Sequence, residues 1–374
     1  MISTIFSIHY KIINNLYNEV GGFIVDEIRK VSFDMIDIND SFFNSLKESY
    51  EEFEEWFKRK SAEGAQAYIL EDNGIQGFLY LKLEEDRDIS ITPNFSSEKR
   101  LKVGTFKVNP HGTKLGERFI KLIFDEMIHE GIKKSYVTVF NKHDDLIDLL
   151  KKYGYLYWGI KETKNGKEEV YVKDLSIFAN DIDLDYPRLN TKGKKKFLLA
   201  IWPKYHTELF PDSRLYTEKT HIIRDSSHTN SIEKIYLSAA FSLPNYNFGD
   251  IIVIYRTGDV GKSAEYSAVA TSICTVKEIR HISSFRNFSD FYNYCKKGSI
   301  FTLQELEEFW NLRKYPYVIK MLYNVALNKR IIRRDLIKEI GISRTDRIVA
   351  YDLTDEEFEK ILEFGGVNES LIIN

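Results

Sequence analysis

The chain has 374 residues, which is too long for one ordinary hydrophobic core and predicts two domains of roughly 150 to 190 residues each. Apolar residues make up 43% of it, with 25 Phe, 23 Tyr and only 7 Pro, a composition that excludes a disordered chain and favours β-rich cores. No stretch approaches the ~20 apolar residues of a membrane span, so we expect a soluble protein. His9, Lys11 and Asn14 interrupt the apolar residues at the N-terminus.

Cysteine content and charge narrow the class further. Cys274 and Cys295 are too few for a disulfide framework or a cysteine metal cluster, so buried thiols in a reducing cytoplasm are expected. The net charge of −3 hides an asymmetry, because residues 1–189 hold 26 Lys and Arg against 33 Asp and Glu, whereas residues 190–374 hold 27 against 23. A solvated surface explains this difference equally well, but the second half is the better candidate to meet a polyanion.

Apolar periodicity predicts the first elements in chain order. Residues 30–38 are predicted to form a strand, and residues 41–64 one long acidic helix with its aromatic residues on one face. Strands over residues 67–71 and 77–82 flank the turn Asp72-Asn73-Gly74, which is typical of a β-hairpin.

Residues 101–155 are the most informative part of the chain. Residues 101–108 alternate apolar and polar as a half-buried strand does, and a turn with Pro110 follows. Apolar residues at three- and four-residue spacing then predict a helix from near Lys114 to Gly131. The first N–H groups of such a helix have no internal partner and lie at its positive end, so they suit phosphate oxygens, and Gly116 would let a ligand approach closely.

A strand, a second helix and a hairpin follow in the predicted order. The short helix is closed by Gly154, and the hairpin turns at Asn165-Gly166. The four predicted elements are residues 135–140, 144–153, 156–160 and 169–173.

The order of these motifs resembles the GNAT N-acetyltransferase superfamily over about residues 25–175. The resemblance is carried by Val108-x-Pro110-x-Gly112-x-x-Leu115-Gly116, then Val139-x-Asn141, then the run 149–155 (LLKKYGY). It implies a mixed α/β sheet flanked by helices that uses acetyl-CoA. In that family the pyrophosphate turn reads Gln/Arg-x-x-Gly-x-Gly/Ala, and this chain departs from it at the first and fourth positions, His111 and Lys114.

The resemblance implies that the strand and turn bind the coenzyme. It places the acceptor and the thioester in the splay beside this strand, bordered by Thr105 and Lys107. An alternative is a degenerate fold that keeps the turn for packing alone. The implied cofactor-binding residues are Phe106, Lys107, Val108, His111, Gly112, Thr113, Lys114, Leu115, Gly116, Glu117 and Asn141.

Acetyl transfer needs a neutral amine, a polarised carbonyl and a proton for the leaving thiolate. The family's frequent acid, a Tyr four residues before the Gly, corresponds here to Leu150. The nearest other acids are therefore Tyr153, Tyr155 and Tyr157, although a core position is the more common role of such residues.

A base and a polar anchor complete the predicted catalytic set. Glu84 and Glu85 follow a predicted strand and are base candidates, but an acidic pair at a strand end is more often solvated surface. Asn141 would hold the coenzyme or a water, with a helix N-cap as an equally good interpretation. The catalytic candidates are thus Tyr153, Tyr155, Glu84 and Asn141, and no metal site is predicted.

Residues 179–196 combine weak periodicity with a Pro, a Gly and a basic run, and are interpreted as a linker between domains at residues 1–178 and 197–374. The second domain is predicted to be β-rich, with a Gly249-Asp250 turn before a buried strand. A capping box formed by Thr354 and Glu357 begins the last helix. The predicted strands and helices are residues 235–238, 251–255, 267–276, 289–296, 303–310, 334–340 and 354–364.

The second half resembles the PUA-like β-barrel superfamily, which includes ASCH and EVE domains. The resemblance is carried by Lys234-Ile-Tyr-Leu-Ser, by residues 249–255 (GDIIVIY) and by residues 268–273 (AVATSI). It implies a PUA-like β-barrel with added helices that binds RNA or a modified base. An unrelated small β-barrel or α+β domain is the alternative.

Four other patterns in the second half have both a functional and a structural interpretation. Residues 257–263 (TGDVGKS) imitate the end of a P-loop, but they join two predicted strands, which favours a hairpin. His206, His221 and His228 lie in one region but show no H-x-x-x-H spacing and no matching Cys, so a zinc site is not expected. The two candidate nucleic-acid surfaces are a basic stretch (Arg330, Arg333, Arg334, Arg344 and Arg347 near Tyr315, Tyr317 and Tyr323) and an aromatic pocket (Trp202, Tyr236 and Tyr255), each with a solvated or core role as the alternative.

Together these patterns predict an acetyl-CoA-dependent N-acetyltransferase acting on an amine acceptor. The acceptor would be associated with nucleic acid, such as tRNA or a modified base, presented by the C-terminal half. A non-catalytic nucleic-acid reader with a degenerate GNAT fold is one alternative, and a protein or small-molecule N-acetyltransferase is another. The oligomeric state and the choice among RNA, DNA and protein partners are left open.

Overall fold

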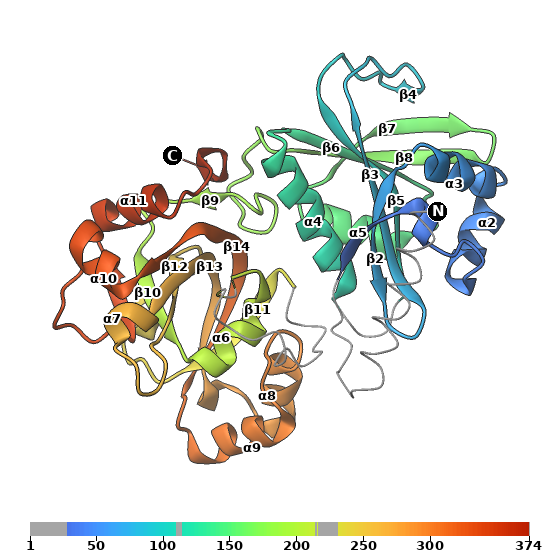
Figure 1. The fold of residues 1–374 in the computed structure, drawn as a ribbon. Helices are drawn as coiled ribbons and strands as arrows, with labels where there is room; N and C mark the ends of the chain where they lie inside the picture. The colour runs from blue at the N-terminus through green and yellow to red at the C-terminus, as the bar shows by residue number, and fades with distance from the viewer. Residues whose placement is uncertain (1–27, 110–113, 214, 216–230, 374) are drawn as a thin grey trace, which may run out of the picture.

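Two β-sheets organise the chain, an eight-stranded sheet in the first half and a six-stranded sheet in the second. The structure is a computed structural model that describes residues 28–109, 114–213, 215 and 231–373. Figure 1 shows the two sheets side by side, with helices on both. The fold is therefore mixed α/β, as predicted. Within the described residues, no helix is both long and apolar enough to cross a membrane.

The first sheet has the strand order β1-β2-β3-β5-β6-β8-β7-β4. All neighbouring strands are antiparallel except β5 and β6, which are parallel and are connected by helix α4 (Leu115–His129). Both predicted hairpins are present as β2–β3 and β7–β8. The strands are β1 (Arg29–Ser32), β2 (Gln66–Glu71), β3 (Ile75–Glu84), β4 (Ile91–Thr92), β5 (Arg100–Val108), β6 (Lys134–Val139), β7 (Leu156–Thr163) and β8 (Gly166–Asp174).

Alternation along the strands builds a core on each face of this sheet. In β3, Leu79 belongs to a cluster with Phe119 and Ile123 of α4, whereas Phe78 and Tyr80 belong to an aromatic cluster on the other face. Each fully buried side chain of this size contributes about 2 kcal/mol of transfer free energy. Helix α5 (Asp144–Lys152) covers the same face as α4.

The single long helix predicted over residues 41–64 is wrong. The segment forms a 3-10 turn (Ser41–Phe43), helix α2 (Asn44–Ser49) and helix α3 (Phe53–Ala62). Tyr50 separates the two helices in an extended conformation with φ −135° and ψ 102°. Its hydroxyl donates to Glu168 Oε1 over 2.9 Å and its ring lies 5.3 Å from that of Phe140. These contacts with distant parts of the sheet outweigh a local pattern that is continuous for a helix.

The second sheet has the strand order β11-β14-β13-β12-β10-β15. Its outer strands β11 and β15 are not paired with each other, so among the described residues the predicted barrel is an open sheet. Apolar clusters cover both of its faces, and helices complete them. The strands are β10 (Lys196–Ile201), β11 (Glu233–Ser238), β12 (Ile251–Arg256), β13 (Val269–His281), β14 (Tyr317–Ile332) and β15 (Ala350–Leu353).

The four helices predicted in the second half lie close to their predicted positions, whereas the helices at residues 203–209 and 264–267 were not predicted. The capping box of Thr354 and Glu357 is present at the start of the last helix. A π-helical turn (Leu336–Ile340) continues the short helix α10 (Arg333–Asp335). The other helices are α6 (Pro203–Leu209), α7 (Ala264–Ser267), α8 (Phe288–Cys295), α9 (Leu303–Leu312) and α11 (Asp355–Phe364).

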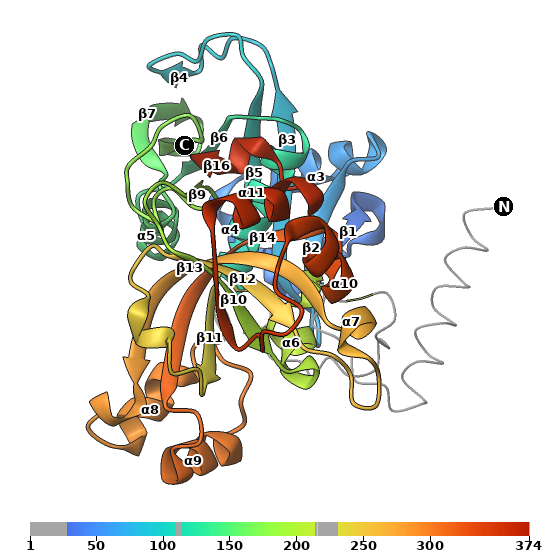
Figure 2. The ribbon, with the colours of Figure 1, turned by 90° about the vertical axis from the view of Figure 1, so that its left-hand side faces the viewer.

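The chain between the two sheets is packed against both of them. The Tyr186 hydroxyl donates to the carbonyl of Tyr323 in β14 over 3.0 Å, and Asn324 Nδ2 donates to the carbonyl of Pro187 over 3.1 Å. Strand β9 (Leu189–Asn190) pairs in parallel with the C-terminal strand β16 (Ile372–Ile373) (Figure 2). The domain division at residues 179–196 stays a prediction. Within this segment, Tyr186 and Pro187 make hydrogen bonds to the second sheet.

Candidate functional site

Strands β5 and β6 part in the middle of the first sheet. They pair in parallel only where Arg100 to Val103 meet Lys134 to Val137. Gly104 is the extra residue of a bulge in the pairing of β5 with β3, where the register shifts between Tyr80 and Leu81. A Cβ at Gly104 would lie 2.7 Å from the ring of Tyr80, so glycine suits this position. Beyond the bulge, β5 follows β3 and β6 follows β8.

A cavity of about 1110 Å³ occupies the gap between the two strands. Pockets for small molecules and cofactors commonly enclose about 300–1,000 Å³, so the gap has room for a large ligand. One wall is the outer half of β5 and the end of β6, and the opposite wall is α2 with the start of α3. Its lining comprises residues 103–108, 137–139, 142–146 and 149, with Lys114, Gly116 and Glu117 of α4 and eight residues between Ser45 and Trp56.

The first turn of α4 borders this cavity. The side chain of its N-cap residue, Lys114, makes no capping hydrogen bond to the first N–H groups of the helix. A Cβ at Gly116 would lie 2.8 Å from Leu149 Cδ2 of α5. Glycine therefore allows close packing of α4 on α5 here, in addition to the ligand approach that the sequence predicts.

The predicted cofactor-binding residues divide into three groups. Leu115 is 1% exposed and packs in the core, and Asn141 lies in an exposed turn that does not line the cavity. His111, Gly112 and Thr113 lie outside the described residues. The residues that line the cavity are Phe106, Lys107, Val108, Lys114, Gly116 and Glu117. Coenzyme binding by this third group stays a prediction.

Lys107 has a structural role that its sequence position does not reveal. Its ammonium donates to the carbonyl of Phe42 and to Ser45 Oγ, and it lies 4.7 Å from the centre of the Phe42 ring. Burial lowers the pKa of Lys107 below its ordinary value. The side chain thus ties β5 to the beginning of α2 across one end of the cavity.

The prediction of Glu84 as a base at this site is wrong by position. Glu84 lies at the other end of β3, opposite Arg100, and does not line the cavity. Tyr136 OH and Lys82 Nζ donate to its carboxylate over 2.6 and 2.8 Å. Burial alone would raise the pKa of Glu84, but these hydrogen bonds hold it below its usual value. Its pairing explains its presence without a catalytic role.

Tyr153 and Tyr155 are core residues with no exposed surface. The Tyr155 hydroxyl lies 2.6 Å from Ser135 Oγ, inside the cluster that α4 forms with the sheet. Burial raises the pKa of both phenols above the ordinary value. Since neither side chain lines the cavity, the prediction of these two as the acid is corrected, for a reason that only burial reveals. Asn141 is likewise not the N-cap of α5, which is His143.

The cavity is also lined by polar residues that the sequence patterns did not indicate. His143 lines it, and burial and the neighbouring Lys142 lower its pKa, so the imidazole is neutral at pH 7 and can accept a proton. Its position directly before a predicted helix was the only available indication.

Glu52 and Tyr50 form the wall opposite β5. Asn165 Nδ2 lies 3.0 Å from both carboxylate oxygens of Glu52, and this hydrogen bonding, with Lys164 at 3.3 Å, lowers the pKa of Glu52. Together with the bond between Tyr50 and Glu168, these contacts connect the α2–α3 break to the β7–β8 hairpin. The wall is held by residues more than 100 positions apart, which no local pattern predicts.

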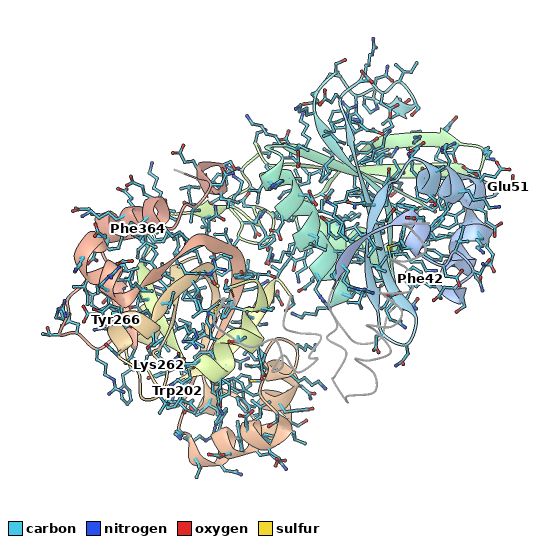
Figure 3. The ribbon with its side chains drawn as sticks, in the orientation of Figure 1. Phe42, Glu51, Trp202, Lys262, Tyr266 and Phe364 are labelled. Carbon is cyan, nitrogen blue, oxygen red and sulfur yellow. The ribbon has the colours of Figure 1, made fainter. Side chains whose placement is uncertain are left out.

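The aromatic pocket predicted in the second half is not formed. Tyr236 and Tyr255 belong to the two different clusters that cover opposite faces of the second sheet, and both are 5% exposed or less. Trp202 is 58% exposed and lies with Lys262 and Tyr266 on the outer side of the second half, away from Phe42 and Glu51 (Figure 3). The three predicted members therefore face three different environments.

Residues of the basic stretch and of the P-loop-like loop have partners within the second half. Arg333 donates to Tyr255 OH and to the carbonyl of Asp346, and it lies beyond the opposite end of β14 from Tyr317. Antiparallel strands β12 and β13 are joined by residues 257–268, which include the short helix α7 after Ser263, so the connection is not the simple hairpin turn that was predicted. Lys262 lies 3.1 Å from Asp259. His206 is buried against Thr271 Oγ1 at 2.8 Å, while His221 and His228 lie outside the described residues. Both cysteines are buried, as predicted.

Comparison with known proteins finds structural similarity alone. No family model and no curated protein matches the chain. A mutant ASCH protein from Zymomonas mobilis matches with 9% identity and a TM-score of 0.29, covering 46% of this chain and 96% of its own. An IAA acetyltransferase from Bacillus cereus matches with 12% identity and a TM-score of 0.31, covering 40% and 99%. The NatC complex bound to Gag peptide and CoA supplies a chain with 15% identity and a TM-score of 0.28, covering 40% and 99%.

Each of these matches spans less than half of this chain. At such identities and TM-scores they carry no conclusion about activity, so the functional conclusion rests on the geometry of the cavity between β5 and β6.

Proposed function

We propose that this chain is an acetyl-CoA-dependent N-acetyltransferase acting on an amine acceptor. The observation that carries the proposal is the parting of the parallel strands β5 and β6 beside the first turn of α4, with a cavity of about 1110 Å³ in the gap. The order of elements around this gap is the one for which the sequence resembles the GNAT superfamily.

The residues around the gap suit the two ends of the coenzyme. On the side facing the gap, backbone N–H and C=O groups of β5 beyond Val103 are not paired with β6, so they can pair with the amides of a pantetheine arm. The first turn of α4 offers N–H groups and the positive end of the helix dipole to phosphates. Bound acetyl-CoA would supply the acetyl group as a thioester.

Two other residues that line the cavity suit the amine. A neutral His143 can take the proton of an ammonium acceptor, and the carboxylate of Glu52 favours a cation in the same cavity. In the transfer, the amine nitrogen forms a bond to the acetyl carbon, the carbon–sulfur bond breaks, and the proton that the nitrogen loses is taken up by the leaving thiolate. The net charge of the second half favours an acceptor associated with nucleic acid.

Titration calorimetry with CoA and substitutions at Gly116 test this proposal. Gly116→Asp places a carboxylate beside the phosphates and should weaken CoA binding by at least about 100-fold, or about 2.7 kcal/mol. Gly116→Ala is the matched control, because its Cβ meets the same Leu149 side chain without the charge, and it should lose less than about 10-fold. Failure of the wild-type protein to bind CoA would refute the proposal.

Labelled acetyl-CoA incubated with separate pools of tRNA, DNA, protein and small amines identifies the acceptor class. We expect label in a single pool. A role as a non-catalytic sensor is the second candidate, because the four residues predicted for catalysis from the sequence, Tyr153, Tyr155, Glu84 and Asn141, do not line the cavity. CoA binding without transfer to any pool would favour that role.

A further inference from the structure

A network of charged side chains joins the two halves beside the cavity. Glu233, the first residue of β11, lies 3.4 Å from Lys114 Nζ, 3.4 Å from Lys152 Nζ and 2.7 Å from Lys277 Nζ. Lys114 is the N-cap residue of α4 and Lys152 is the last residue of α5, whereas Lys277 is in β13. A single carboxylate of the second sheet therefore holds two helices of the first.

Two further carboxylates balance the network. Glu117 lies 3.0 Å from Lys152 and 3.6 Å from Lys114, and Asp183 lies 2.7 Å from Lys277. Three lysines thus meet three carboxylates. All six side chains are 36% exposed or less, so solvent screens these charges less than it screens a surface pair.

The charges in this network are fixed near neutral pH. Burial alone would raise the pKa of Glu233, but the ammonium groups of Lys114, Lys277 and Lys152 hold it far below its usual range. Burial opposes the charged form of Lys152 as well, yet Glu117 and Glu233 raise its pKa above the ordinary value. Glu233, Lys152 and Lys277 are therefore ionised under conditions in which a phosphate ligand would bind.

Lys114 belongs to this network and to the cavity at once. Its side chain and that of Glu117 line the gap between β5 and β6, where the proposed function places the coenzyme phosphates. In the structure the ammonium is directed to carboxylates, which neutralise the positive charge that a phosphate would otherwise meet.

We propose that Glu233 sets the affinity of the first half for phosphate-bearing ligands, because an anion at the start of α4 must compete with Glu233 for Lys114. Ligand binding and the contact between the two halves are then linked, and by reciprocity each weakens the other. This inference rests on the proposed function, since it takes the ligand to be CoA.

The network favours competition at Lys114 over a general loosening of the interface. Lys152 keeps Glu117 and Lys277 keeps Asp183 when the charge of Glu233 is removed. Among the described residues, Lys114 then keeps its longer contact with Glu117, at 3.6 Å. Removing the charge of Glu233 therefore frees Lys114 more than the other two lysines.

The test compares CoA with acetyl-pantetheine, which lacks the phosphates, by calorimetry on the full chain. Glu233→Gln keeps the shape of the side chain and should tighten CoA binding about 5- to 10-fold at low salt, with a smaller gain at high salt. Acetyl-pantetheine should bind both proteins equally. Asp183→Asn is the matched control, because it removes a charge from the same network without a contact to Lys114, and CoA affinity should stay unchanged.

A second variant separates competition from any other effect of the substitution. In a chain that carries Lys114→Gln, the further change Glu233→Gln should give no gain in CoA affinity, because the group they compete for is gone. Unchanged or weaker CoA binding by Glu233→Gln, with the wild type binding normally, would overturn the role of Glu233 alone. Absence of CoA binding by the wild type would overturn the proposed function, and this inference with it.

Discussion

The two sheets use their central strands in opposite ways. In the first, β5 and β6 pair over four residues each and then part around a cavity. In the second, β13 and β14 remain paired from Val269 with Ile332 to His281 with Tyr317, despite three register shifts. The first sheet therefore leaves unpaired backbone groups and a cavity for a ligand between two of its strands. In the second sheet, β13 and β14 pair along their length and leave no such gap between them.

The polar side chains follow the same division. In the second sheet, Thr275 donates to Asn324 over 2.9 Å, and Ser213 and Ser272 lie 2.6 Å apart, so these buried groups satisfy one another. In the first half, Glu52, before α3, and His143, before α5, line a cavity. We therefore expect ligand binding and catalysis in the first half and a structural role for the second sheet. Glu233 is the residue through which the second half would affect ligand binding in the first.

Substitutions of two glycines test how firmly the segment between the sheets is packed, and we expect the largest loss of stability here. Gly154 has φ +80°, and a Cβ there would lie 2.2 Å from the carbonyl oxygen of Leu184. Gly131 has φ +65° with nothing within 4 Å of such a Cβ, which makes it the matched control. Gly131→Ala should cost about 1 kcal/mol and Gly154→Ala more than about 3 kcal/mol.

Urea unfolding measures both variants. Similar losses for Gly154→Ala and Gly131→Ala would mean that the chain after β8 does not press on the end of α5, and the contrast between packed and open regions would lose one of its supports.

The loss of stability in acid tests how tightly the second half is packed around His206. Burial lowers the pKa of His206 to about 3, well below the 6.5 expected in the unfolded chain. The unfolded state therefore binds a proton that the folded state does not, so this contribution to stability is full above pH 6.5 and is lost as the pH falls toward 3. Between pH 7 and pH 5, about 2 kcal/mol should be lost through His206.

The variant His206→Gln should lose correspondingly less stability over the same pH interval, whatever its stability at pH 7. Urea unfolding at pH 7 and pH 5 gives the comparison. Equal pH dependence in the variant and the wild type would show that His206 is protonated in the folded state, and the second sheet would be more open than its packing indicates.

The smallest effect is expected at Lys262, in the loop that imitates a P-loop. Its side chain is 68% exposed and its partner is Asp259, 3.1 Å away. Lys262→Ala should change the free energy of unfolding by less than about 0.5 kcal/mol and leave CoA affinity unchanged. Weaker CoA binding would place the ligand in the second half and reverse the comparison between the sheets.

Local patterns predicted β5 and α4, which border the cavity, but not the break between α2 and α3 on its other side. The helix expected from Lys114 to Gly131 is α4, Leu115–His129, and the strand expected over residues 101–108 is β5, Arg100–Val108. The capping box at Thr354 was also predictable, because the residues that form it are three positions apart. Spacing and turn chemistry act within a few residues, so they can be read from the chain alone.

Roles at the site needed the tertiary structure. Tyr153 and Tyr155 stand beside a predicted helix end, yet whether a phenol faces a cavity or the core depends on how that end packs. The break at Tyr50 depends on Glu168, and the contact between Lys114 and Glu233 spans 119 positions. Site residues predicted from local sequence were therefore misplaced where contacts with distant residues decide the position of the side chain.

The amino-acid sequence by itself determined the mixed α/β class and, beside the cavity, the strand β5 and the helix α4. Only the tertiary structure decided which side chains face that cavity, where β5 and β6 part, and which carboxylate of the second half meets Lys114. The physical reason is that hydrophobic periodicity acts over neighbouring residues, whereas burial and the pairing of charges depend on distances that exist only after the chain has folded.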